Sequence, residues 1–134
     1  MTTAHGKQTV ITVATKNVSP FVKTSTLERG AAVHNTTGYG VDDELNAGGL
    51  KNGKFTMAGV YDNTVTVGPR IVLNPLVGTL VVITRAVEGT TTGKPLDTFN
   101  AIVEKYVETN PHDDMVTWSA DFTVSGPVVP TVQP

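Results

Sequence analysis

Apolar and polar residues alternate without a break from Val116 to Ser125, near the end of the chain. Alternation with a period of two is typical of a strand that buries one face. The pattern ends at Gly126 and Pro127, because proline has no amide hydrogen to give to a ladder. The apolar positions are Val116, Trp118, Ala120, Phe122 and Val124, and they include the only tryptophan of the chain. We therefore predict that this strand carries a large share of the core.

Four other stretches have the character of strands. Residues 8–15 are rich in β-branched side chains, and residues 21–33 fit a strand better than one turn of helix. Residues 54–61 follow, with Phe55 on the buried face. Residues 79–87 are apolar on both faces, which predicts a central strand covered on both sides.

The stretch 96–109 fits two structures. Phe99, Val103 and Tyr106 fall at helical spacing, while Phe99 and Val103 also share one strand face. The pattern alone favours a helix, but the short hairpin-like link to the alternating stretch favours a strand, and we predict a strand with Phe99 in the core. The single helix that we predict is short: Pro69 can open it, and Pro75 limits it to one or two turns.

Residues 34–53 contain five glycines and no sustained periodicity, which predicts a long loop. Loops of this length in compact domains are usually functional or disordered. The dipeptide Asn52-Gly53 at its end is a strong signal for a tight hairpin turn.

The composition fits one β domain at 1–126, followed by an extended proline-rich arm at 127–134. A chain of 134 residues without cysteine must be stabilised by packing or by neighbours. Its net charge of -2 argues against a protein that grips duplex DNA, which would need a basic patch. No apolar run has the length of a membrane helix or the form of a signal peptide, so we expect synthesis in the cytoplasm and no membrane partner.

No set of residues predicts catalysis, a cofactor or a metal. The segment Gly89–Pro95 has three residues between its glycines where a phosphate-binding loop needs four, so it is better explained as a hairpin loop. The cluster Asp42–Glu44 lacks the pattern of a calcium loop. The three histidines are isolated from one another: His5, His34 and His112. We therefore predict that the protein is not an enzyme.

Several segments, in this order and spacing, resemble the major tail tube proteins of long, flexible-tailed bacteriophages, especially the short forms from phages of actinobacteria. The segments are Val18–Phe21 with Thr37–Gly40, Gly49–Asp62, Gly68–Pro69 leading to Leu76–Thr79, Phe99–Tyr106 and Asp114–Gly126. The resemblance covers most of the chain. It implies a mainly β fold, an antiparallel sandwich or barrel-like sheet with one short flanking helix and a long inter-strand loop.

The same resemblance implies a virion protein whose hexameric rings stack into a tail tube. DNA would pass through the lumen without specific binding, and an acidic wall rich in Thr and Ser favours such passage. The other expected partners are the tape measure, tail terminator and baseplate proteins. The loop would reach the neighbouring ring through Thr37, Tyr39, Val41, Asp42, Asp43, Glu44, Leu45 and Leu50.

Two competing functions are a virion decoration or head-tail joining protein and a carbohydrate-binding β-sandwich. The first shares the β-rich, self-associating character of a tube protein. The second needs exposed aromatic side chains along a groove, and only Tyr39 looks exposed in this sequence.

Overall fold

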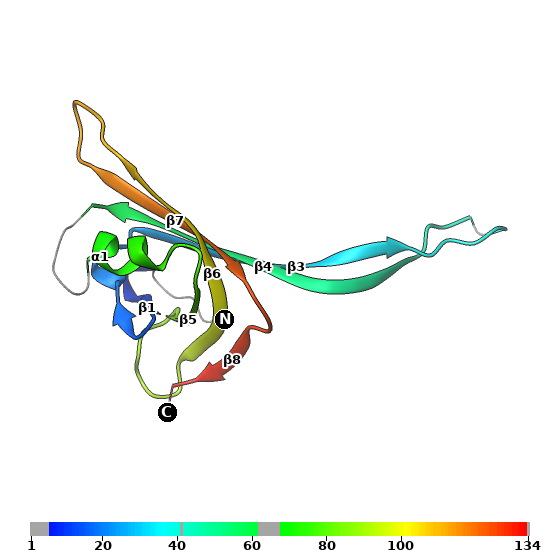
Figure 1. Ribbon diagram of the computed structural model, residues 1–134. Helices are drawn as coiled ribbons and strands as arrows, with labels where there is room; N and C mark the ends of the chain where they lie inside the picture. Colours follow the sequence, from blue (N-terminus) through cyan, green and yellow to red (C-terminus); the bar gives the residue numbers. More distant parts are fainter. Residues whose placement is uncertain (1–5, 41, 62–67, 134) are drawn as a thin grey trace.

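The computed structural model describes residues 6–40, 42–61 and 68–133 (Figure 1). Within this part of the chain, eight strands form one antiparallel sheet in the order β2-β1-β5-β6-β7-β4-β3, and β8 pairs with β6. The mainly β fold with one short helix is therefore confirmed. The elements are β1 (Val10–Val13), β2 (Lys16–Asn17), β3 (Thr24–Asn35), β4 (Asn46–Val60), α1 (Pro69–Leu73), β5 (Leu80–Ala86), β6 (Pro95–Thr109), β7 (Thr117–Val124) and β8 (Val129–Val132), with short 3-10 turns at Gly6–Gln8, Ser19–Phe21 and Asn74–Leu76.

The sheet curls around a core to which every long strand of the body contributes one face (Figure 1). Helix α1 begins at Pro69, as predicted, and adds Val72 and Leu73 to this core. Of the residues predicted to lie in the core, Trp118, Phe122, Phe55 and Phe99 are buried, whereas Val124 and Val116 are half-buried. Phe55 packs edge-on against Phe99, with ring centroids 5.5 Å apart.

Strand β6 contains a β-bulge, which explains its mixed sequence pattern. Its pairing with β7 shifts register between Val103 and Lys105, so Glu104 is an inserted residue. The insertion moves the inward face by one position, and Phe99, Val103 and Tyr106 all pack on the core side. The bulge therefore produces the helix-like spacing of three between Val103 and Tyr106. The predicted strand is confirmed.

Strand β4 and the chain before β3 approach each other very closely at Gly59. A Cβ atom added to Gly59 would lie 1.9 Å from the carbonyl oxygen of Phe21. That same oxygen accepts a hydrogen bond from Nε1 of Trp118 at 3.2 Å, and Lys23 donates its amide to the carbonyl of Ala58 at 2.8 Å. Glycine at this position thus lets the chain close over the tryptophan and satisfy its indole N–H.

Three sequence predictions need correction. The predicted loop 34–53 is mostly a hairpin, since β3 runs to Asn35 and β4 begins at Asn46, which leaves only 36–45 as loop. Asn52 and Gly53 are not a turn but lie inside β4, opposite Gly30 and Arg29. The glycines and alanines that hid the periodicity are tolerated because this ribbon packs against no core.

The third correction concerns β5. β5 is covered on one face only, because Leu80 and Val82 on its outer face are 60% and 51% exposed. Beyond Pro127 the chain joins the sheet: β8 pairs with β6, and Gln133 exchanges two backbone hydrogen bonds with Gly93 and Lys94.

We predict that Gly59→Ala lowers the free energy of unfolding by at least about 2 kcal/mol, because the added methyl group meets a backbone atom that cannot move independently. Urea titration followed by Trp118 fluorescence measures this change. Gly48→Ala is the matched control, since a Cβ atom there meets nothing within 4 Å. Equal effects of the two substitutions would contradict the role assigned to Gly59.

Candidate assembly surfaces

The β3–β4 hairpin extends far beyond the body of the protein as a two-stranded ribbon (Figure 1). We call residues 30–52 the arm. Strand β4 pairs with β7 only from Lys54 onward, so no third strand lies beside the arm among the described residues. At about 3.3 Å per residue the arm reaches roughly 35 Å from the body.

Almost every described residue of the arm is exposed, including large apolar ones. Val33 is 68% exposed, Leu50 87%, and Tyr39 is fully exposed near the tip. An isolated two-stranded hairpin is marginally stable in water, because it buries too little apolar surface to offset its ordering entropy. The arm therefore has the character of a segment that a partner covers.

The predicted loop-contact residues lie together in this arm. Leu50 belongs to β4, the remaining described ones lie in the connection 36–45, and Val41 falls outside the described residues. The amide of Leu45 donates to Oγ1 of Thr37 at 2.7 Å, and the side-chain amide of Asn35 donates to Glu44 at 3.2 Å. These bonds close the tip and leave Tyr39, Asp42 and Asp43 pointing to solvent.

The outer face of the sheet, turned away from the core, has two halves. On β4 and β7 it is polar, with Thr56 opposite Asp121 and Ala58 opposite Ser119. One pair of charges on this half is balanced locally, since Nζ of Lys105 lies 3.2 Å from Oδ2 of Asp121. Oγ1 of Thr123 likewise donates to the carboxylate of the inserted Glu104.

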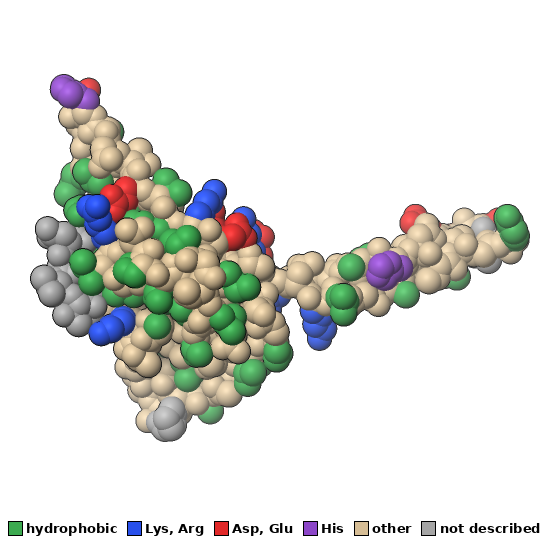
Figure 2. Space-filling view, viewed as in Figure 1, with side chains coloured by type: hydrophobic (Ala, Val, Ile, Leu, Met, Phe, Trp, Pro, Cys, Tyr) green, Lys and Arg blue, Asp and Glu red, His purple; other side chains and the backbone are tan. Residues whose placement is uncertain are grey.

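On β5 and β6 the outer face is apolar. Leu80 lies directly opposite Ile102, with Val82 two residues along β5, and the three side chains are 60%, 41% and 51% exposed. Figure 2 displays apolar side chains over the body and along the arm. The sequence signal for this patch was the apolar character of both faces of residues 79–87. That pattern predicts burial on both sides, whereas the single chain leaves the outer face open.

Free strand edges complete the candidate surface. Strand β3 ends the sheet and has β4 as its only neighbour among the described residues. The opposite border is better protected: Oγ of Ser19 accepts from the amide of Ile11 at 2.6 Å and donates to its carbonyl at 3.2 Å. The long unpaired edge of β3 is therefore a template for another chain.

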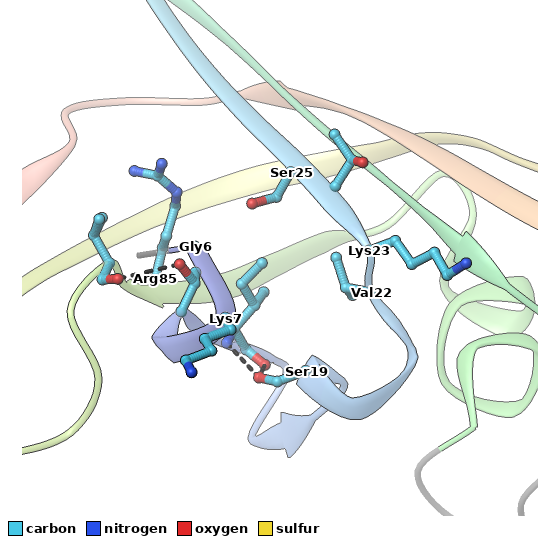
Figure 3. Close-up of a pocket in the computed structure, with 11 residues that line it drawn as sticks. Gly6, Lys7, Ser19, Val22, Lys23, Ser25 and Arg85 are labelled. Atoms are coloured by element: carbon cyan, nitrogen blue, oxygen red, sulfur yellow. Dashed lines mark hydrogen bonds between the residues drawn. The ribbon is translucent and has the colours of Figure 1, made fainter. Parts of the chain in front are cut away.

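A cavity of about 650 Å³ is lined by residues from the N-terminal turn and β1, from the start of β3 and from the end of β5 (Figure 3). Nη1 of Arg85 on its wall lies 3.5 Å from Oδ2 of Asp97. The hydroxyl oxygen of Ser19 accepts a hydrogen bond from the amide of Ile11 in β1. The described residues that line it include no Asp, Glu or His to act as an acid or base. The polar side chains of its lining are hydroxyls and cations.

The histidines and acidic residues form no recognisable site. Nδ1 of His112 lies 2.6 Å from Asp113, and both side chains are almost fully exposed at the β6–β7 tip. His34 lies on the arm over Gly49, while His5 falls outside the described residues. No group of three or more His, Cys, Asp or Glu residues gathers as for a metal within the part of the chain that is described. No described helix is long and apolar enough to cross a membrane.

A small cluster of polar side chains links α1 to the end of the sheet. Nη1 of Arg70 donates to the hydroxyl of Tyr61 at 3.3 Å, and Nε lies 3.7 Å from Oε1 of Glu108. Beside them, the ring of Tyr106 stacks at a tilt on Trp118, with centroids 6.0 Å apart. Burial raises the pKa of Tyr106 above its ordinary value, and the negative charge of Glu108 raises this pKa further.

Comparison with known proteins identifies the fold. No family model and no curated protein matches the sequence. The structure, however, matches a chain from the tail of an empty gene transfer agent particle with C6 symmetry, at a TM-score of 0.77 and 11% identity, over 96% of this chain and 99% of that one. It matches the SPP1 tail tube at a TM-score of 0.77 and 10% identity, over 98% and 80%.

A third match is a chain of the sheath-tube complex of an extracellular contractile injection system, at a TM-score of 0.73 and 11% identity, over 97% of this chain and 92% of that one. At these identities the matches establish a shared fold. The resemblance to tail tube proteins predicted from the sequence is thereby confirmed at the level of fold.

We predict that shortening the arm leaves a folded body. Residues 31–51 are replaced by Asn-Gly, which joins Gly30 to Asn52, a directly paired position. The free energy of unfolding should change by less than about 1 kcal/mol, since surface changes away from the core have small effects. Urea titration measures it, and an unfolded product would mean that the arm is part of the folding unit.

We also predict that Tyr106 contributes to a loss of stability in alkali. Because the folded state keeps its proton above the ordinary pKa of 10.0, the unfolded state ionises first and the free energy of unfolding falls as pH rises past that value. Tyr106→Phe has no such proton, so its free energy of unfolding should fall less steeply between roughly pH 9 and pH 11. Identical slopes for the two proteins would refute this.

Proposed function

We propose that this chain is the structural subunit of a bacteriophage-type tail tube, with no enzymatic role. The observation that carries the proposal is the extent of the structural likeness, which takes in 96% of this chain and 99% of a chain from a C6-symmetric tail. Six copies would form a ring, and rings would stack into a tube in the virion tail. The chain would be made in the cytoplasm of the bacterial host.

The free surfaces of the single chain support assembly. A head-to-tail contact joins two different surfaces of the same subunit, so it closes into a ring or continues as a filament. We expect the apolar patch of Leu80, Val82 and Ile102 to be buried against a neighbouring subunit in the ring, because exposed apolar patches mark interaction sites. The unpaired edge of β3 can extend the sheet into another subunit.

The arm is proposed as the contact between rings. It reaches roughly 35 Å from the body, far enough to pass the boundary of its own subunit. Its exposed apolar side chains, including Val33 and Leu50, would be covered on stacking. Tape measure, tail terminator and baseplate proteins are the partners expected inside the tube and at its ends.

The polar half of the outer face is proposed as the lumen wall. Lys105 on this face is paired with Asp121, and Thr and Ser occupy most of the neighbouring outer positions of β7. A wall made mostly of uncharged Thr and Ser side chains releases few counterions from DNA phosphates, so DNA can slide through it without being held. Conduction is then passive.

Electron microscopy of the purified protein at high concentration tests the proposal, with tubes or stacked rings as the expected result. Leu80→Glu should keep the fold, since this side chain is 60% exposed, but abolish rings by placing a charge in the apolar patch. Thr90→Glu in the exposed β5–β6 loop is the matched control and should still assemble. Persistent monomers or closed trimers of the unmodified chain would contradict a tube subunit.

A further inference from the structure

A small apolar groove lies beside α1. It is bounded by Ala14 and Lys16 around the β1–β2 turn and by Ile71, Val72, Pro75 and Leu76 from α1 and the 3-10 turn that follows. Its volume is about 320 Å³, at the lower end of the range for cavities that hold a ligand. Ile71 on its rim is 49% exposed. We call it the α1 groove.

The turn that forms one wall of the α1 groove is held in an unfavourable backbone conformation. Ala14 and Thr15 both have positive φ, at 48° and 68°. Glycine and asparagine are the usual residues in such a two-residue turn, and a β-branched residue with positive φ is uncommon. Strain of this kind tends to occur where the conformation serves a contact. Here it presents Ala14 and Lys16 to the groove.

The arm tip carries the complementary chemistry. Tyr39 is fully exposed, and the carboxylates of Asp42 and Asp43 follow it closely in the chain. A tyrosine combines a large apolar ring with a polar end and is enriched at the energetic centres of interfaces. The α1 groove offers an apolar floor with one ammonium group, that of Lys16, at its border.

The tip and the groove belong to opposite ends of the molecule. In Figure 1 the arm leaves the body on one side, while α1 and β1 lie on the other. A chain therefore cannot bring its own tip into its own groove. Two different surfaces at opposite ends produce a contact that repeats from copy to copy, as required for growth along a tube.

We propose that the α1 groove is the receptor for the arm tip of a second copy of this chain. Tyr39 fills the apolar floor against Ile71, and Asp42 or Asp43 pairs with Lys16. The proposal rests on the proposed tube function and specifies where the arm of one ring docks on the next. The contact is anchored by one aromatic side chain and oriented by charge.

Cysteine cross-linking tests the contact directly, because the chain has no cysteine of its own. The variant Tyr39→Cys/Ile71→Cys is assembled and then oxidised. It should form a ladder of disulfide-linked chains on a non-reducing gel, whereas either single variant should not progress beyond dimers. Asp113→Cys/Ile71→Cys is the matched control, since Asp113 is equally exposed at the other hairpin tip and should give no ladder.

Charge reversal gives a second test that does not depend on the cysteine variants assembling. Lys16→Glu alone, and Asp42→Lys with Asp43→Lys, should each raise the protein concentration needed for assembly by about tenfold, and the combined variant should restore it. Trp118 fluorescence checks that each variant is folded.

The outcomes separate this inference from the proposed function. Tubes that give no ladder, with charge reversals that fail to compensate, would overturn the docking site while leaving the tube function intact. If the unmodified chain forms no rings or tubes, the proposed function fails and the docking site with it.

Discussion

The constraint on which the structure depends is that the arm has no core of its own. Two strands alone cannot bury both of their faces, and in residues 30–52 nearly all described side chains are exposed. The sequence of the arm reflects this: Gly48, Gly49, Ala31 and Ala32 contribute little packing. A hairpin of this length and exposure is marginally stable in isolation, and we propose that a neighbouring copy completes it. The apolar outer face of β5 and β6 is incomplete in the same sense.

The body is built to hold that incomplete segment in place. Strand β4 is continuous from the arm into the core, where Phe55 and Met57 are buried beside β7. The close approach at Gly59 and the hydrogen bond from Trp118 to Phe21 fix the start of β3 against the same sheet. The direction of the arm is therefore set by buried contacts, even though the arm itself is exposed.

Strand positions with a clear period of two could be predicted from the sequence, and the stretch 116–125 became β7 with Trp118 and Phe122 inside. The bulge at Glu104 was hidden because one inserted residue makes a strand face look helical. The sequence predicts a loop where the arm lies, because a ribbon with no buried face has no hydrophobic period to detect. The exposed contact residues, such as Tyr39, could be proposed from the resemblance, but the α1 groove could not. It is formed by residues of the β1–β2 turn, of β2, and of α1 with the 3-10 turn after it, which are distant in the sequence.

Amide hydrogen exchange, measured on the monomer and on the assembled protein, tests most directly whether the arm is completed by a neighbouring copy. The arm amides of residues 30–52 should exchange rapidly in the monomer and become strongly protected in the assembly, while the β7 amides around Trp118 remain protected in both. Arm amides that are equally protected in the monomer, or that stay unprotected in tubes, would contradict this dependence on a second copy.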